Sequence, residues 1–149
     1  MIIKKKYITS LIALLVLMGL LLNSNFVYSA ASSGGDEKSK TSLYKSGKKL
    51  VNRAKKLEEK NKTEKAKKLY LKAYDKFEKA YAKDKKNPDI LNYLGFTLRK
   101  TGSLEKAEKF YLEGLKLDAG HLGINEYLGE LYVQTGRIER ANRKKLICI

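Results

Sequence analysis

The stretch Asn92-Tyr93-Leu94-Gly95 returns 34 residues later as Glu126-Tyr127-Leu128-Gly129. At the same spacing, Lys100-Thr101-Gly102 returns as Gln134-Thr135-Gly136. A fixed period of about 20 to 50 residues is typical of repeat proteins, in which each repeat is one supersecondary unit that stacks on the next. The sequence therefore predicts a stack of repeats.

Each repeat carries the pattern of two short helices. Leu91, Leu94 and Leu98 are three or four residues apart, which is the spacing of one buried helix face. A glycine then ends this helix, and a small-large-small face follows in the second helix, formed by Ala107, Tyr111 and Gly114. We therefore expect two antiparallel helices per repeat, joined at Gly102 and again at Gly136.

The period of 34 residues, with Leu-Gly early, Gly seven residues later and Ala five residues after that, resembles the tetratricopeptide repeat. Two departures are Gly114, where this family usually has Ala, and Asp118-Ala119 in place of the common Asp-Pro. The resemblance implies an all-α fold, an antiparallel helix-pair solenoid of about 2.5 to 3 repeats.

The period divides the chain into repeats. The best repeat covers residues 88–121, and the next covers residues 122–149, with a divergent or truncated second helix because Lys145 stands where a large apolar residue belongs. Phe77 precedes Tyr111 by 34 residues, so we expect a degenerate N-terminal helix pair over residues 42–87. In this pair Lys60-Asn61 takes the place of Leu-Gly, and the first helix is longer than usual.

The N-terminal residues have the pattern of a sorting signal. Lys4-Lys5-Lys6 precedes an apolar run from Ile8 to Leu22, the order of a secretory signal peptide, and the run is shorter than the roughly 20 residues that span a bilayer. We expect a signal peptide over residues 1–31, cleaved after Ser29 or Ala31, and an exported, periplasmic protein. The alternative is an uncleaved segment that anchors the chain in the inner membrane. Residues 32–41 are expected to form a flexible linker.

The chain is strongly basic, with 32 Lys and Arg, 16 Asp and Glu, and a net charge of +16. Such a charge is compatible with a polyanionic partner. However, most of the bases are Lys and they alternate with Glu, as in residues 105–109, which favours a solvated helix surface and makes a nucleic-acid partner the less favoured reading. The alternative function is therefore electrostatic binding of nucleic acid or an anionic envelope polymer through the lysine-rich N-terminal helices, densest at residues 45–68.

Catalysis has little support, because the chain has one His and one Cys and no phosphate-binding glycine loop or nucleophile motif. We expect no catalytic residue, no metal site and no cofactor. His121 is expected in a loop between repeats. Cys148 lies in an apolar C-terminal end, residues 146–149, which predicts either self-association or a truncated reading frame.

The resemblance also implies a function. In such solenoids, first-helix residues that are not used in packing line a concave groove that holds a peptide or helix of another protein. We therefore predict a protein-interaction module. Phe96 is the leading anchor if it is exposed beside Arg99; otherwise it packs against a neighbouring helix. The expected groove residues are Asp89, Asn92, Phe96, Arg99 and Lys100 in one repeat and Glu126, Glu130, Val133 and Gln134 in the next.

Overall fold

The computed structural model describes residues 32–145. The expected signal peptide over residues 1–31 and the apolar end with Cys148 lie outside the described residues. The chain divides into the units Met1–Glu37 and Lys38–Ile149, and the second unit carries the repeats. Every regular element in the described part of the chain is an α-helix, as the repeat pattern predicts.

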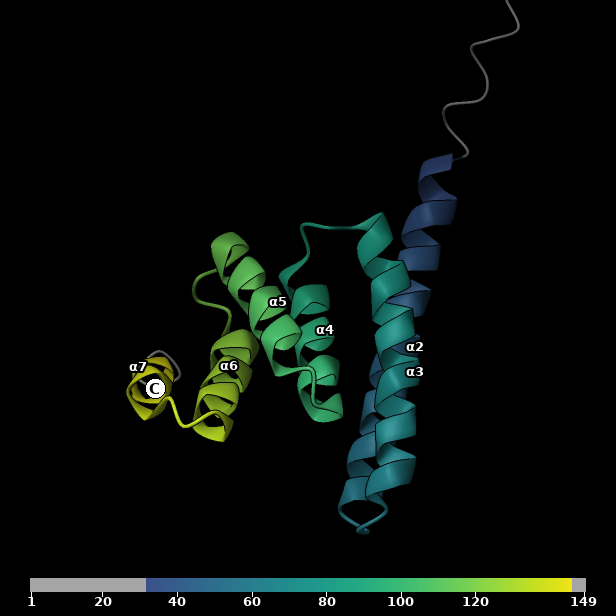
Figure 1. The fold of residues 1–149 in the computed structure, drawn as a ribbon. Helices are drawn as coiled ribbons and strands as arrows, with labels where there is room; N and C mark the ends of the chain where they lie inside the picture. The colour runs from purple at the N-terminus through teal and green to yellow at the C-terminus, as the bar shows by residue number, and fades with distance from the viewer. Residues whose placement is uncertain (1–31, 146–149) are drawn as a thin grey trace, which may run out of the picture. The chain divides into compact units, whose positions relative to one another are not determined.

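The helices follow one another as three successive pairs (Figure 1). Within the second unit, α3 packs on α4, α4 on α5, α5 on α6 and α6 on α7. This stack confirms the all-α helix-pair solenoid. The helices are α2 (Ser32–Glu58), α3 (Thr63–Lys83), α4 (Pro88–Thr101), α5 (Leu104–Leu117), α6 (Leu122–Gln134) and α7 (Ile138–Lys145).

The expected flexible linker over residues 32–41 is wrong, because these residues form the beginning of α2. A helix that is already nucleated gains one backbone hydrogen bond for each residue added, so the packed part of α2 extends towards the N-terminus through Ser and Gly. Lys40 also holds this part, since its Nζ lies 3.1 Å from Asp84 Oδ2 after α3.

The boundaries of α4 and α6 are fixed by local signals. Asn87 caps α4, with its side chain accepting a hydrogen bond from Ile90 N at 3.3 Å, and Pro88 follows at the first helical position. His121 caps α6 through Nδ1, which accepts from Ile124 N at 3.1 Å. Gly102 ends α4 with φ of 94°, a left-handed conformation that glycine adopts without strain.

Close approach of the two helices in a pair depends on a glycine against an aromatic ring. A Cβ added to Gly95 would lie 2.5 Å from the Tyr111 ring, and one added to Gly47 would lie 2.6 Å from the Phe77 ring. Phe77 and Tyr111 are one repeat apart, so Gly47 is the counterpart of Gly95. The expected assignment of Lys60-Asn61 to this position is therefore wrong.

The corrected register shows where the first pair is longer. Gly47 precedes the turn residue Asn61 by 14 residues, whereas Gly95 precedes Gly102 by seven. α2 and α3 have 27 and 21 residues, and α4 and α5 have 14 each. The added part of α3 is packed, since Ala66 and Tyr70 are fully buried.

We predict that Gly95→Ala destabilises the fold by about 1 to 3 kcal/mol, because the new methyl group would overlap the buried Tyr111 ring. Gly129→Ala is the matched control at the same repeat position. Its Cβ would meet Lys144 Cβ at an ordinary 3.5 Å, so helix propensity should leave this variant neutral or up to about 1 kcal/mol more stable. Urea unfolding of both variants tests this, and equal effects would contradict it.

Buried tyrosines make the fold sensitive to high pH. Burial raises the pKa of Tyr111 above its ordinary value of 10.0, and burial together with a hydrogen bond to Glu78 raises the pKa of Tyr74 to about 12. The neutral phenol therefore favours the folded state, so stability is complete below about pH 10 and falls above it. We predict fewer tyrosinates in the native than in the denatured protein at about pH 11 by ultraviolet absorbance. Coincident titration curves would refute this.

Candidate functional site

The first helices of the three pairs, α2, α4 and α6, contact one another through polar side chains. We call the side of these helices that carries the contacts the inner face. One contact joins α4 to α2, one α2 to α6 and one α4 to α6. They are Lys100 Nζ to Glu58 Oε2 at 2.8 Å, Lys55 Nζ to Tyr127 Oη at 3.4 Å, and an ion pair between Arg99 and Glu130.

Phe96 is buried on the inner face and is not an exposed anchor. It is only 3% exposed, its ring centroid lies 5.7 Å from that of Tyr70 and 4.7 Å from that of Tyr127, and Lys55 Nζ lies 4.9 Å from it. Tyr70 and Lys55 belong to the added turns of α3 and α2, which therefore cover Phe96. The alternative, packing against neighbouring helices, is what the structure shows.

Arg99 is held rather than free. Its side chain is 10% exposed, it forms the ion pair with Glu130, and its guanidinium carbon lies 5.7 Å from the Phe96 ring centroid and 5.8 Å from that of Tyr127. Arg99 Nε and Tyr111 Oη are buried without a hydrogen-bond partner in the described part of the chain. Arg99 thus connects α4 to α6 and is little available to a partner molecule.

The other predicted residues of α4 are also engaged. Asn92 is 6% exposed, and its Nδ2 lies 2.7 Å from where a Cβ on Gly123 would be, so the Asn92 amide packs against the beginning of α6. Asp89 Oδ1 lies 3.4 Å from His121 Nε2. Together with the Lys100–Glu58 ion pair, these contacts leave α4 with few groups to offer a ligand.

The structure brings together three of the predicted residues of α6, Glu126, Glu130 and Val133, around a cavity of about 260 Å³ between α6 and α7. Gly129 lines this cavity too, because no aromatic ring packs on it as Tyr111 packs on Gly95. Val133 is 58% exposed. Gln134 is exposed at the end of α6 and is not one of the residues found around the cavity.

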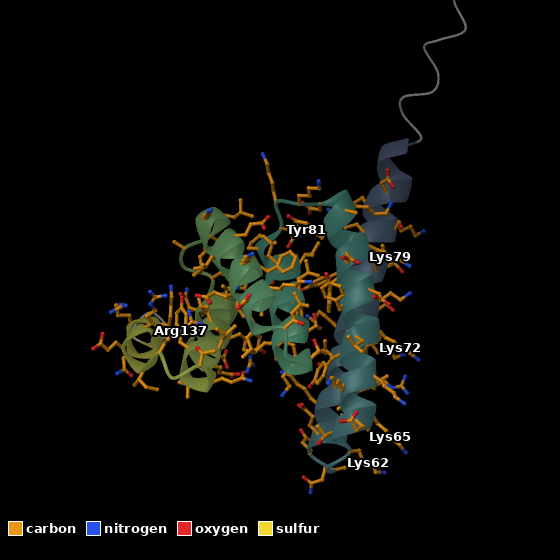
Figure 2. The ribbon with its side chains drawn as sticks, viewed as in Figure 1. Lys62, Lys65, Lys72, Lys79, Tyr81 and Arg137 are labelled. Carbon is orange, nitrogen blue, oxygen red and sulfur yellow. The ribbon has the colours of Figure 1, made fainter. Side chains whose placement is uncertain are left out.

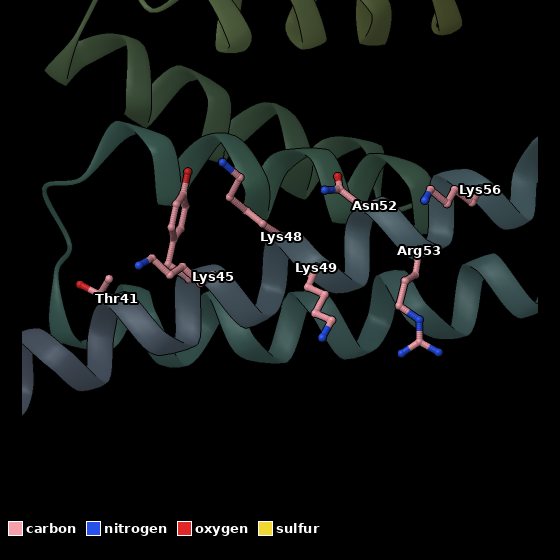
Figure 3. Close-up of a pocket in the computed structure, with 8 residues that line it drawn as sticks. Thr41, Lys45, Lys48, Lys49, Asn52, Arg53 and Lys56 are labelled. Carbon is pink, nitrogen blue, oxygen red and sulfur yellow. The ribbon is translucent and has the colours of Figure 1, made fainter.

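A second, larger cavity of about 710 Å³ lies along α2 and was missed by the sequence reasoning (Figure 3). Three of its residues, Tyr44, Lys48 and Asn52, have the same offsets from Gly47 as Asn92, Phe96 and Lys100 have from Gly95, so they are the groove positions of the first repeat. The described lining residues are Thr41, Tyr44, Lys45, Lys48, Lys49, Asn52, Arg53 and Lys56.

A sequence signal for this site was present. Leu43, Gly47 and Leu50 have the spacing of Leu91, Gly95 and Leu98. Counting back one period from Gly95 leads instead to Asn61, because the added turns shift the register. The offset therefore has to be counted from a helix contact and not from the period.

Neither metal binding nor membrane crossing is indicated within residues 32–145. Among them, no three or more His, Cys, Asp or Glu side chains gather where a metal ion would bind. None of the described helices combines the length and the apolar character that a bilayer-spanning helix needs.

Comparison with known proteins agrees with this architecture. Residues 76–109 match the family model described as tetratricopeptide repeat. A structure of the type III secretion translocator chaperone SycD of Yersinia enterocolitica is 18% identical, with a TM-score of 0.52, over 68% of this chain and 71% of SycD. No curated protein matches the sequence.

Two further SycD structures, both 18% identical with a TM-score of 0.50, show the same fold. One is an alternative dimer, which aligns over 70% of this chain and 74% of SycD. The other is a complex with a peptide of the translocator YopD, aligned over 68% and 72% of the two chains. The matching repeat model, the 34-residue period and the stacked helix pairs lead to one conclusion: the chain is a tetratricopeptide repeat protein.

Proposed function

We propose that the protein is an interaction module that binds a segment of another protein along its inner face. The observation that carries this proposal is the cavity on α2, which occupies groove positions that are filled by contacts between helices in α4. The fold supports it, since SycD, which shares the fold, has been solved with a peptide of YopD. The smaller cavity at α6 provides a second contact region on the same face.

We further propose that the protein acts without catalysis. The single histidine is used by the fold, because Nδ1 of His121 caps α6 and its Nε2 contacts Asp89. General acid–base chemistry needs converging titratable groups in a cavity, and the α2 cavity presents Lys and Arg with Tyr44, Asn52 and Thr41. A binding role fits these groups better than a reaction.

We also propose that the protein works in the bacterial cell envelope, after export. Support comes from the basic and apolar order of residues 1–31. We predict that a fusion of residues 1–41 to alkaline phosphatase is active in a Gram-negative host, because this reporter needs disulfides that form only outside the cytoplasm. A fusion lacking residues 1–31 is the control. Activity equal to that of the control would contradict export.

Phe96→Ala is a stability variant and not a binding probe. Because the Phe96 ring is enclosed by Tyr70 and Tyr127, we predict that removing it costs about 3 to 5 kcal/mol of unfolding free energy. Urea unfolding measures this cost. A loss below about 1 kcal/mol would show that the ring is not packed as described.

Photo-crosslinking tests the proposed function. We predict that a benzoylphenylalanine placed at Asn52 or Val133 of the full chain forms adducts with a small set of proteins in envelope extract, because both positions lie on the inner face. The matched control is Leu112, an exposed position on the second helix α5. The adducts should persist in about 0.5 M salt, where screening acts over about 4 Å.

Two outcomes would contradict the proposal. Identical adducts from Asn52 and Leu112 would show that contact is not confined to the inner face. Adducts that all disappear in salt, with nucleic acid or envelope polymer recovered instead, would favour the electrostatic alternative.

A further inference from the structure

We infer that the inner face takes an acidic, extended segment of the partner protein, held along a basic stripe on α2. We define the basic stripe as Lys45, Lys48, Lys49, Arg53 and Lys56. The inference rests on the proposed function and adds the charge, the conformation and the place of the occupant. No acidic residue is among the described residues that line the cavity.

The stripe is a concentration of like charge that the fold itself does not neutralise. Lys45, Lys49 and Arg53 follow one another at intervals of four residues on one helix face, a spacing at which like charges destabilise a helix by about 0.2 to 0.5 kcal/mol per pair. Within residues 32–145 none of these three side chains forms an ion pair, whereas Lys40, Arg99 and Lys100 do. A carboxylate-rich occupant would remove this repulsion.

The surroundings of the stripe favour a single chain over a broad surface. Figure 3 shows Lys48 and Asn52 on one side of α2 and Lys49 and Arg53 on the other. On the first side α4 flanks the cavity, since Lys48 Nζ lies 5.5 Å from the Tyr44 ring centroid and 5.8 Å from that of Tyr93. A chain lying over α2 can contact both sides, and the Asn52 amide can bond its backbone.

The length of the cavity sets the length of the segment. From Thr41 to Lys56, α2 rises about 22 Å at 1.5 Å per residue. An extended peptide covers this distance with about seven residues at 3.3 Å each. The stripe therefore matches a short acidic motif.

α3 supplies a basic surface that serves as the control. Lys65, Lys72 and Lys79 are exposed at intervals of seven residues and project outward from α3 (Figure 2). A nucleic acid or an anionic bilayer responds to the summed charge and would engage both surfaces. An acidic segment in the α2 cavity depends on the α2 cations alone.

The test measures binding of a fluorescent heptaglutamate peptide to the full chain by anisotropy, with heptaglutamine of the same length as the neutral comparison. One variant carries Lys49→Glu and Arg53→Glu in α2. The control carries Lys72→Glu and Lys79→Glu in α3, with the same change in net charge. Circular dichroism checks the fold, and the neutral pair Lys49→Gln and Arg53→Gln replaces the reversal if the reversal unfolds α2.

We expect heptaglutamate to bind more tightly than heptaglutamine, with the α2 variant weakening it at least about tenfold and the α3 control less than about threefold, since close charge pairs contribute more than distant ones. Equal losses in both variants, or binding of single-stranded DNA that both variants weaken equally, would overturn the inference in favour of diffuse charge attraction. Equal affinity for the two peptides would also overturn it. If adducts still form at Asn52, the interaction function stands and only its acidic preference fails.

Discussion

The structure depends on the close contact between a glycine backbone and an aromatic ring in each of the first two helix pairs. Gly47 against Phe77 and Gly95 against Tyr111 bring the two helices of a pair together at a distance that a Cβ would prevent. Interiors are packed densely, so this contact fixes which residues of the first helix face the core and which remain for a ligand. The function of each first helix therefore follows from the position of its glycine.

The two added turns in α2 and α3 then decide where the inner face is open. They carry Lys55, Glu58 and Tyr70 to the inner side of α4, where these residues cover Phe96 and pair with Lys100. Arg99 and Glu130 join α4 to α6 in the same way. The face is thus occupied by the protein's own side chains in the middle, and it is open along α2 and beside Gly129.

The repeats were predictable from sequence because their signals are local. Gly102 and the Leu-Gly at Leu94 and Leu128 recur at a constant period, and the period predicts helix pairs that stack. The site was predictable only in part, because exposure depends on neighbours that the period does not place. Phe96 occupies a groove position, and its burial comes from an extension in another repeat whose shift also concealed Gly47.

The central claim is the register of the first helix pair, and a nuclear Overhauser spectrum of the labelled protein tests it most directly. The account predicts cross-peaks from the Phe77 ring to the α-protons of Gly47 and from the Phe96 ring to the Tyr70 ring, because these groups are in contact. Cross-peaks from the Phe77 ring to Lys60 or Asn61, with none to Gly47, would contradict it. In that case α2 would present different residues, and the cavity and its basic stripe would not form.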